Sequence, residues 1–165
     1  MNHKAALLMA TMAVSLSSAG IAARAEILFA QGQWAAVRYG AQCEAVARPL
    51  LPAARRQPQS RAGFSFAPAG RRVGEFHARL SRVPRPGSSV MLTIGDRPFL
   101  LVARGDWAWS SGPAQDSAII EAARAATSMR IVLRDGLGRR FTDRYLLAGA
   151  PTAIDAAAAA CAGKI

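Results

Sequence analysis

The stretch SVMLTIGDRPFLLV, from Ser89 to Val102, indicates the fold class of this chain. Two apolar runs flank the dipeptide Gly95-Asp96, a pattern typical of a β-hairpin with a tight turn. Pro98 lacks a backbone N–H, which places the start of the second arm at a sheet edge or just inside the sheet. The stretch therefore indicates antiparallel β structure.

Further strands are predicted on both sides of this hairpin. Short apolar or alternating segments occur at residues 27–29, 34–39, 64–66, 73–80, 129–134 and 141–147. The last two flank the sequence Asp135-Gly136-Leu137-Gly138 and predict a second hairpin. Residues 48–62 mix proline, arginine, glutamine and alanine without a clean period, which predicts a solvated loop or short flexible linker.

Two helices are predicted in the C-terminal half. Asp116 is a candidate N-cap for a helix through residues 118–126. An alanine-rich segment from Pro151 predicts the second helix, in which Thr152 and Asp155 have capping-box spacing. We expect an α+β domain, mainly antiparallel β in a sandwich or curled sheet, with two helices in the C-terminal half.

Residues 1–25 have the pattern of a cleavable export signal. Lys4 precedes an uncharged apolar run at residues 5–16, and Ala23 and Ala25 stand at the two positions that a signal peptidase recognises. The apolar core is shorter than the roughly 20 residues that span a bilayer. We expect cleavage after Ala25, a single domain at 26–165, and a periplasmic or secreted location with no transmembrane segment.

The two cysteines are Cys43 and Cys161. In an oxidising compartment such a pair favours a disulfide. Two separate buried thiols are the alternative, because free cysteine packs as a small hydrophobic residue. A disulfide would join an early strand to the last helix, on the helix face that also carries Ile154.

The positive charge is concentrated in one segment. The chain has a formal net charge of +11, and residues 48–85 hold nine arginines against one acid, Glu75. Such a segment attracts anionic glycans or lipopolysaccharide head groups, whereas an exported protein rarely meets nucleic acid. The alternative is compositional bias in a chain rich in alanine, glycine and arginine. The candidate polyanion-binding residues are Arg55, Arg56, Arg61, Arg71, Arg72, Arg79 and Arg82.

No residue pattern indicates catalysis. After signal cleavage His77 is the only histidine, no Gly-x-Ser-x-Gly motif occurs, and the ten carboxylates form no suggestive cluster. We therefore expect a protein that is not an enzyme and has no metal or cofactor, with His77 as an ordinary strand residue.

The segment Trp107-Ala108-Trp109 places two indoles on one side if it is extended. The indoles form either an exposed platform for a sugar or protein partner, or part of the core packing. The preceding Arg104-Gly105-Asp106 is interpreted as a turn rather than as an adhesion tripeptide.

The chain resembles the invasion-associated locus B family of bacterial periplasmic proteins. Five features carry this resemblance: Gly32-Gln33-Trp34 after the export signal, the paired Ile119-Ile120, the Asp135–Gly138 turn, the Leu146–Gly149 strand end and the closing alanine-rich helix. The resemblance implies a small, β-rich, non-enzymatic exported binding protein, linked in some pathogens to host-cell invasion, whose partner is an unknown envelope or host protein. The alternative is a structural or inhibitory envelope protein that binds anionic polymers through residues 48–85.

Overall fold

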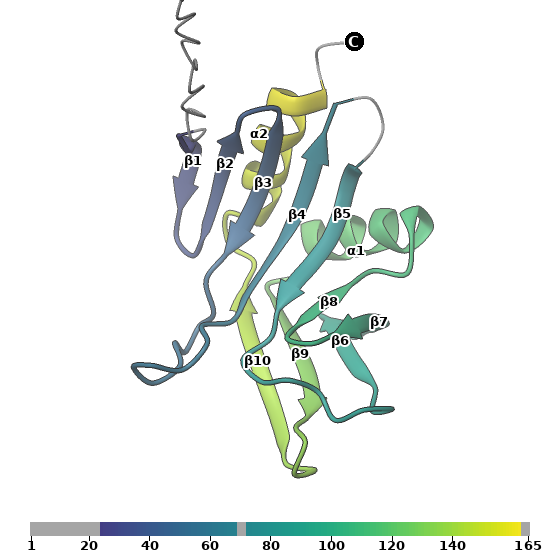
Figure 1. The fold of residues 1–165 in the computed structure, drawn as a ribbon. Coiled ribbons are helices and arrows are strands. Elements are labelled where there is room, and N and C mark those ends of the chain that lie inside the picture. Colours follow the sequence, from purple (N-terminus) through teal and green to yellow (C-terminus); the bar gives the residue numbers. More distant parts are fainter. Residues whose placement is uncertain (1–23, 69–71, 163–165) are drawn as a thin grey trace, which may run out of the picture.

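The protein folds around one curled antiparallel sheet, seen in a computed structural model that describes residues 24–68 and 72–162 (Figure 1). The order of the strands in this sheet is β1-β2-β3-β4-β5-β8-β7-β6-β9-β10. The strands are β1 (Glu26–Gln31), β2 (Trp34–Tyr39), β3 (Gln42–Ala47), β4 (Arg61–Ala67), β5 (Arg72–Arg79), β6 (Val90–Ile94), β7 (Arg97–Arg104), β8 (Trp107–Trp109), β9 (Ser128–Arg134) and β10 (Arg140–Leu146). The helices are α1 (Pro113–Ala125) and α2 (Ala150–Ala162).

The predicted fold class is confirmed, and the sheet is curled rather than split into a sandwich. Both helices lie in the C-terminal half of the sequence and pack on one face of the sheet, α2 on β1–β4 and α1 mainly on β5 (Figure 1). Residues 1–23 of the predicted export signal lie outside the described residues. Within the described ranges, no helix is long and apolar enough to cross a membrane.

Tight turns connect several neighbouring strands. Gly95 and Gly105 each occupy the first position of a two-residue turn, with φ of 58° and 60°, and the aspartate after each has no positive φ. This is the type II′ geometry, which matches the twist of antiparallel strands and favours glycine at that first position. The predicted hairpin at Gly95-Asp96 is confirmed, and Arg104-Gly105-Asp106 is the turn between β7 and β8.

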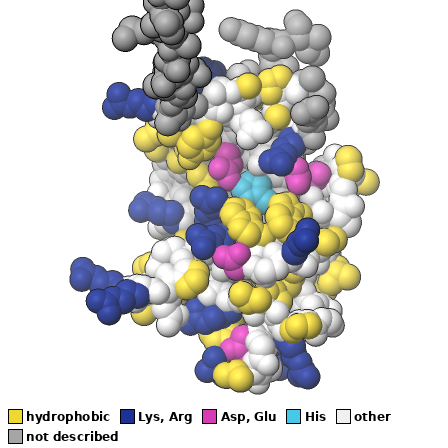
Figure 2. Space-filling view, viewed as in Figure 1, with side chains coloured by type: hydrophobic (Ala, Val, Ile, Leu, Met, Phe, Trp, Pro, Cys, Tyr) yellow, Lys and Arg dark blue, Asp and Glu magenta, His cyan; other side chains and the backbone are white. Residues whose placement is uncertain are grey.

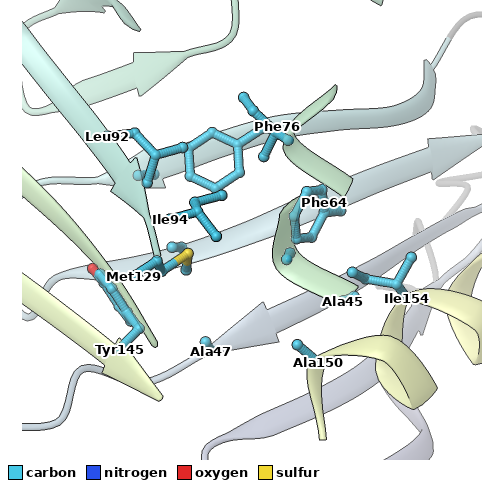
Figure 3. Packing of buried hydrophobic residues seen from close by; sticks show 14 of the residues in the cluster. Ala45, Ala47, Phe64, Phe76, Leu92, Ile94, Met129, Tyr145, Ala150 and Ile154 are labelled. Atoms are coloured by element: carbon cyan, nitrogen blue, oxygen red, sulfur yellow. The ribbon is translucent and has the colours of Figure 1, made fainter. Parts of the chain in front are cut away.

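The core lies between the helices and one face of the curled sheet (Figure 3). Phe64 of β4 and Phe76 of β5 pack edge to face, with ring centroids 5.4 Å apart, and both side chains are fully buried. Leu92 of β6 lies beside Phe76, and Ile154 of α2 lies beside Phe64 (Figure 3). The alternation of strand side chains thus directs one face of the sheet into a single core.

The two ends of the sheet are linked by a hydrogen bond from a buried indole. Trp34 of β2 is 1% exposed, and its Nε1 donates to the carbonyl oxygen of Leu146 at the end of β10, at 2.8 Å. Because β2 and β10 lie near opposite ends of the strand order, this bond helps to keep the sheet curled.

The first helix does not begin where the sequence predicts. It starts at Pro113, a residue suited to the first helical turn, so Asp116 lies inside that turn and is not the N-cap. The buried Asp116 carboxylate instead accepts hydrogen bonds from the backbone N–H of Phe76, at 2.9 Å, and from the hydroxyl of Ser110. The predicted cap is therefore an anchor between α1 and β5.

The last helix also begins earlier than predicted. It starts at Ala150, so Thr152 lies within the helix rather than at its cap, and Asp155 forms an ion pair with Arg124 of α1. The predicted capping box is therefore wrong.

The predicted disulfide is confirmed. Cys43 of β3 is bonded to Cys161 of α2, with the two Cα atoms 5.8 Å apart. Both cysteines are buried, so the bond fixes the last turns of α2 to the core face of the sheet.

The loop of residues 48–60 is confirmed as a loop but is tied to the domain. The side chain of Gln59 accepts from the backbone N–H of Ala53 at 2.9 Å and donates to its carbonyl oxygen at 3.0 Å. The N–H of Leu50 donates to the carbonyl oxygen of Arg144 on β10 at 2.7 Å. The Leu50 bond joins the segment to β10, and the Gln59 bonds join its two halves. The loop ends at residue 60 rather than at 62, because β4 begins at Arg61.

Candidate ligand-binding site

The sheet face that points away from the helices carries a group of polar and aromatic side chains. In the pairing of the strands, Gly63 lies opposite His77, which lies opposite Trp109, while Arg79 lies opposite Trp107. Alternate residues of a strand point to opposite faces, so side chains from β3, β4, β5 and β8 meet here. We call this surface the aromatic face and define it by Glu44, Arg61, His77, Trp107 and Trp109.

The two indoles share this face, as the sequence predicts. The rings of Trp107 and Trp109 are nearly parallel, with an interplanar angle of 16° and centroids 6.2 Å apart, and both side chains are half-buried. The guanidinium carbon of Arg61 lies 5.1 Å from the ring centroid of Trp107, a cation–π contact. The indoles thus pack against their neighbours and still present surface to solvent.

His77 lies next to the indoles and is only 6% exposed. Its ring centroid is 6.0 Å from that of Trp107, and its Nε2 is 2.9 Å from Oε1 of Glu44. Nε2 is therefore paired with the Glu44 carboxylate, whereas Nδ1 has no hydrogen-bond partner among the described residues. Buried polar atoms without partners are rare in folded proteins and often indicate a functional site.

A glycine makes room for the imidazole. A Cβ atom at Gly63 would lie 2.5 Å from the carbonyl oxygen of Ala45 and 3.3 Å from Cε1 of His77. Any larger residue would force the strand backbone or the imidazole to shift. His77 does lie in a strand as predicted, but its contacts with Gly63 and Glu44 were missed. An isolated glycine within a strand pattern, which often indicates close approach of another group, was the available signal.

Glu44 is charged at neutral pH. Burial opposes its ionisation, but the contact with His77 and the positive charge of Arg61 outweigh burial, so the pKa of Glu44 lies below its ordinary value of 4.5.

A cavity of about 340 Å³ opens on the aromatic face. All five defining side chains line it, together with Arg72 and Glu75, whose Nε and Oε2 atoms are 3.2 Å apart. Figure 2 shows this side of the molecule, with the histidine between two acidic side chains and hydrophobic side chains beside it. The cavity thus combines flat apolar surface with both hydrogen-bond donors and acceptors, the mixture typical of small-ligand sites.

A second cavity, of about 490 Å³, adjoins the first. Three arginines, Arg48, Arg61 and Arg79, line it together with residues of the 48–60 loop. Arg79 is paired with Asp106, with Nε and Oδ2 2.9 Å apart. We call this the basic cavity. Arg61 lines both cavities and so forms their common boundary.

The structure does not bring the seven predicted polyanion-binding arginines into one surface. Arg61, Arg72 and Arg79 line the cavities, as described above. Arg55 and Arg56 lie exposed on the 48–60 loop and line neither cavity. Arg82 packs its guanidinium over the ring of Phe141 on β10, 4.8 Å from the ring centroid. Arg71 lies outside the described residues. Arg48, which the candidates did not include, is a further member of the basic cavity.

Comparison with protein-family models, curated proteins and solved structures finds no match to this chain. Within residues 24–68 and 72–162, no group of three or more histidine, cysteine, aspartate or glutamate side chains is placed to hold a metal ion.

Proposed function

We propose that this chain is an exported, non-enzymatic binding protein, similar in kind to the invasion-associated locus B proteins, and that the aromatic face binds its ligand. One observation carries the proposal. Two half-buried, parallel indoles border a cavity that is also lined by the Glu44 carboxylate and the Arg61 guanidinium.

The energetics of this arrangement favour an occupied site. When a ligand covers the exposed indole surface and removes it from water, the free energy of the complex is lowered. The Glu44 carboxylate and the Arg61 guanidinium line the same cavity and offer a ligand a hydrogen-bond acceptor and several donors. The sheet holds the indoles and these polar side chains in place, so little conformational entropy is lost on binding.

Two further observations support export. The first strand, β1, begins at Glu26, directly after the proposed cleavage position at Ala25. The Cys43–Cys161 disulfide is the kind of bond that persists in the periplasm or outside the cell. The proposed partner is an envelope or host molecule that exposes a group able to enter the cavity.

Calorimetric titration of residues 26–165 tests the site. The probes are maltohexaose, chitohexaose, hexagalacturonate and purified lipopolysaccharide. We expect at least one probe to bind, and Trp107→Ala and Trp109→Ala to weaken its binding at least about ten-fold. Phe141→Ala is the matched control. Phe141 is also a half-buried aromatic residue in contact with arginines, but it lies on β10. Equal affinity in all three variants, or no binding of any probe, would contradict the proposal.

The second candidate is a structural or inhibitory envelope protein that binds anionic polymers through residues 48–85. The exposed Arg55 and Arg56, on a loop that is held in place, favour it. If this candidate is correct, retention on heparin decreases when both are changed to glutamine and does not depend on Trp109. Retention that depends on Trp109 alone would favour the aromatic face.

A further inference from the structure

We propose that the ligand of the aromatic face is an acidic saccharide, whose sugar ring packs on Trp107 and Trp109 while its anionic group is held by Arg61 at the boundary with the basic cavity. This inference rests on the proposed function and specifies the class of ligand.

The balance of charge at the site favours an anion. Three carboxylates lie on this side of the sheet or at its edge, and each already contacts a cationic or imidazole side chain. The contacts are Glu44 with His77 at 2.9 Å, Glu75 with Arg72 at 3.2 Å and Asp106 with Arg79 at 2.9 Å. By contrast, neither Arg48 nor Arg61 has a carboxylate within ion-pair distance in the part of the chain that the structure describes. Together the two cavities are lined by four arginines and two carboxylates, so the net charge that a ligand meets is positive.

The position of Arg61 links the two cavities. Its guanidinium lies 5.1 Å from the Trp107 ring and lines both the indole-bearing cavity and the basic cavity. A carboxylate, sulfate or phosphate attached to a ring on the indoles can thus reach Arg61 directly. Such a group accepts charge-assisted hydrogen bonds from the guanidinium fork, which are stronger than neutral ones.

The other groups of the aromatic face suit a sugar ring. The C–H bonds on a pyranose face carry a small positive charge and pack against the negative face of an indole. The hydroxyl groups at the edge of the ring donate hydrogen bonds, so they can bond to the carboxylate of Glu44, which lines the cavity. An acidic saccharide uses the indoles, Glu44 and Arg61 together.

A matched pair of probes tests the inference. Hexagalacturonate and its fully methyl-esterified form share the same sugar chain and differ in charge. We expect the ester to bind wild-type residues 26–165 at least about ten-fold more weakly. Arg61→Gln should weaken binding of the acid at least about ten-fold more than it weakens binding of the ester. A merely structural role of Arg61 would weaken both probes equally.

The controls separate this inference from the proposed function. Arg82→Gln removes one positive charge that lines neither cavity, and the binding of both probes should not change. Added salt should weaken binding of the acid more than binding of the ester. Inorganic sulfate, as a free anion, should compete only weakly because it does not contact the indoles.

The outcomes are distinct. Equal affinity for acid and ester, with both lost in Trp109→Ala, would overturn the acidic-saccharide inference and leave the proposed function standing. Sulfate that competes as well as the acid, with no effect of Trp109→Ala, would reduce the site to simple anion binding and overturn both. If neither the galacturonate probes nor lipopolysaccharide bind, the inference is wrong, and the neutral saccharides decide the proposed function.

Discussion

Loss of the Cys43–Cys161 disulfide should destabilise the fold by a large and calculable amount. The bond closes a loop of 118 residues, and in the chain-entropy model such a loop restricts the unfolded state by about 5 kcal/mol at 25 °C. Both cysteines are buried, so alanine is the suitable replacement, because a serine hydroxyl there would lack a hydrogen-bond partner. The perturbation is therefore Cys43→Ala with Cys161→Ala, compared with the oxidised wild-type domain.

Urea unfolding, followed by circular dichroism, measures the effect. With a slope of about 2 kcal/mol per molar urea, a loss of about 5 kcal/mol lowers the unfolding midpoint by roughly 2.5 M. Reduction of the wild type should produce a similar shift, whereas the reductant should not change the double variant. A reduced wild type with the midpoint of the oxidised protein would refute the loop-entropy reasoning. A shift in the double variant on addition of reductant would show that the reductant acts elsewhere.

Three further predictions follow from single contacts. Gly63→Ala should lower the free energy of unfolding by about 1–3 kcal/mol in urea titrations, because its Cβ would lie 2.5 Å from the Ala45 carbonyl oxygen; unchanged stability would show that the strand adapts. Trp34→Phe should cost roughly 1–3 kcal/mol in thermal unfolding, because the carbonyl oxygen of Leu146 loses its donor, and an unaltered transition would contradict the role of this bond. The pKa of Glu44 is below 4.5, so its charged form stabilises the fold above that pH, and the contribution is lost as the pH falls through the folded-state pKa. The stability difference between wild type and Glu44→Gln should therefore shrink from pH 6 to pH 3, and parallel pH curves would refute this.

Local sequence patterns predicted the elements well where one short segment determines its own structure. The Gly95-Asp96 hairpin and the alanine-rich last helix depend on turn geometry and helix propensity, which act over a few residues. The disulfide was predictable because two cysteines have only one possible pairing within a chain.

The helix starts were predicted less well, because tertiary contacts compete for the capping side chains. Asp116 is an acceptable N-cap by residue type, yet its carboxylate accepts a hydrogen bond from the backbone N–H of Phe76 on β5. The helix therefore begins at Pro113. Pro113, a residue type favoured in the first helical turn, was the local signal for this start.

Most of the antiparallel strands, the two C-terminal helices, the disulfide pairing and the shared side of the two indoles could be predicted from the sequence, because each follows from local geometry or from a single possible partner. The contact of His77 with Glu44 across Gly63, and the place of Arg61 between the two cavities, follow only from the complete fold. Those residues come from different strands, and their contacts depend on register and on the curl of the whole sheet. Both properties arise from the packing of the complete core, which no short segment of sequence contains.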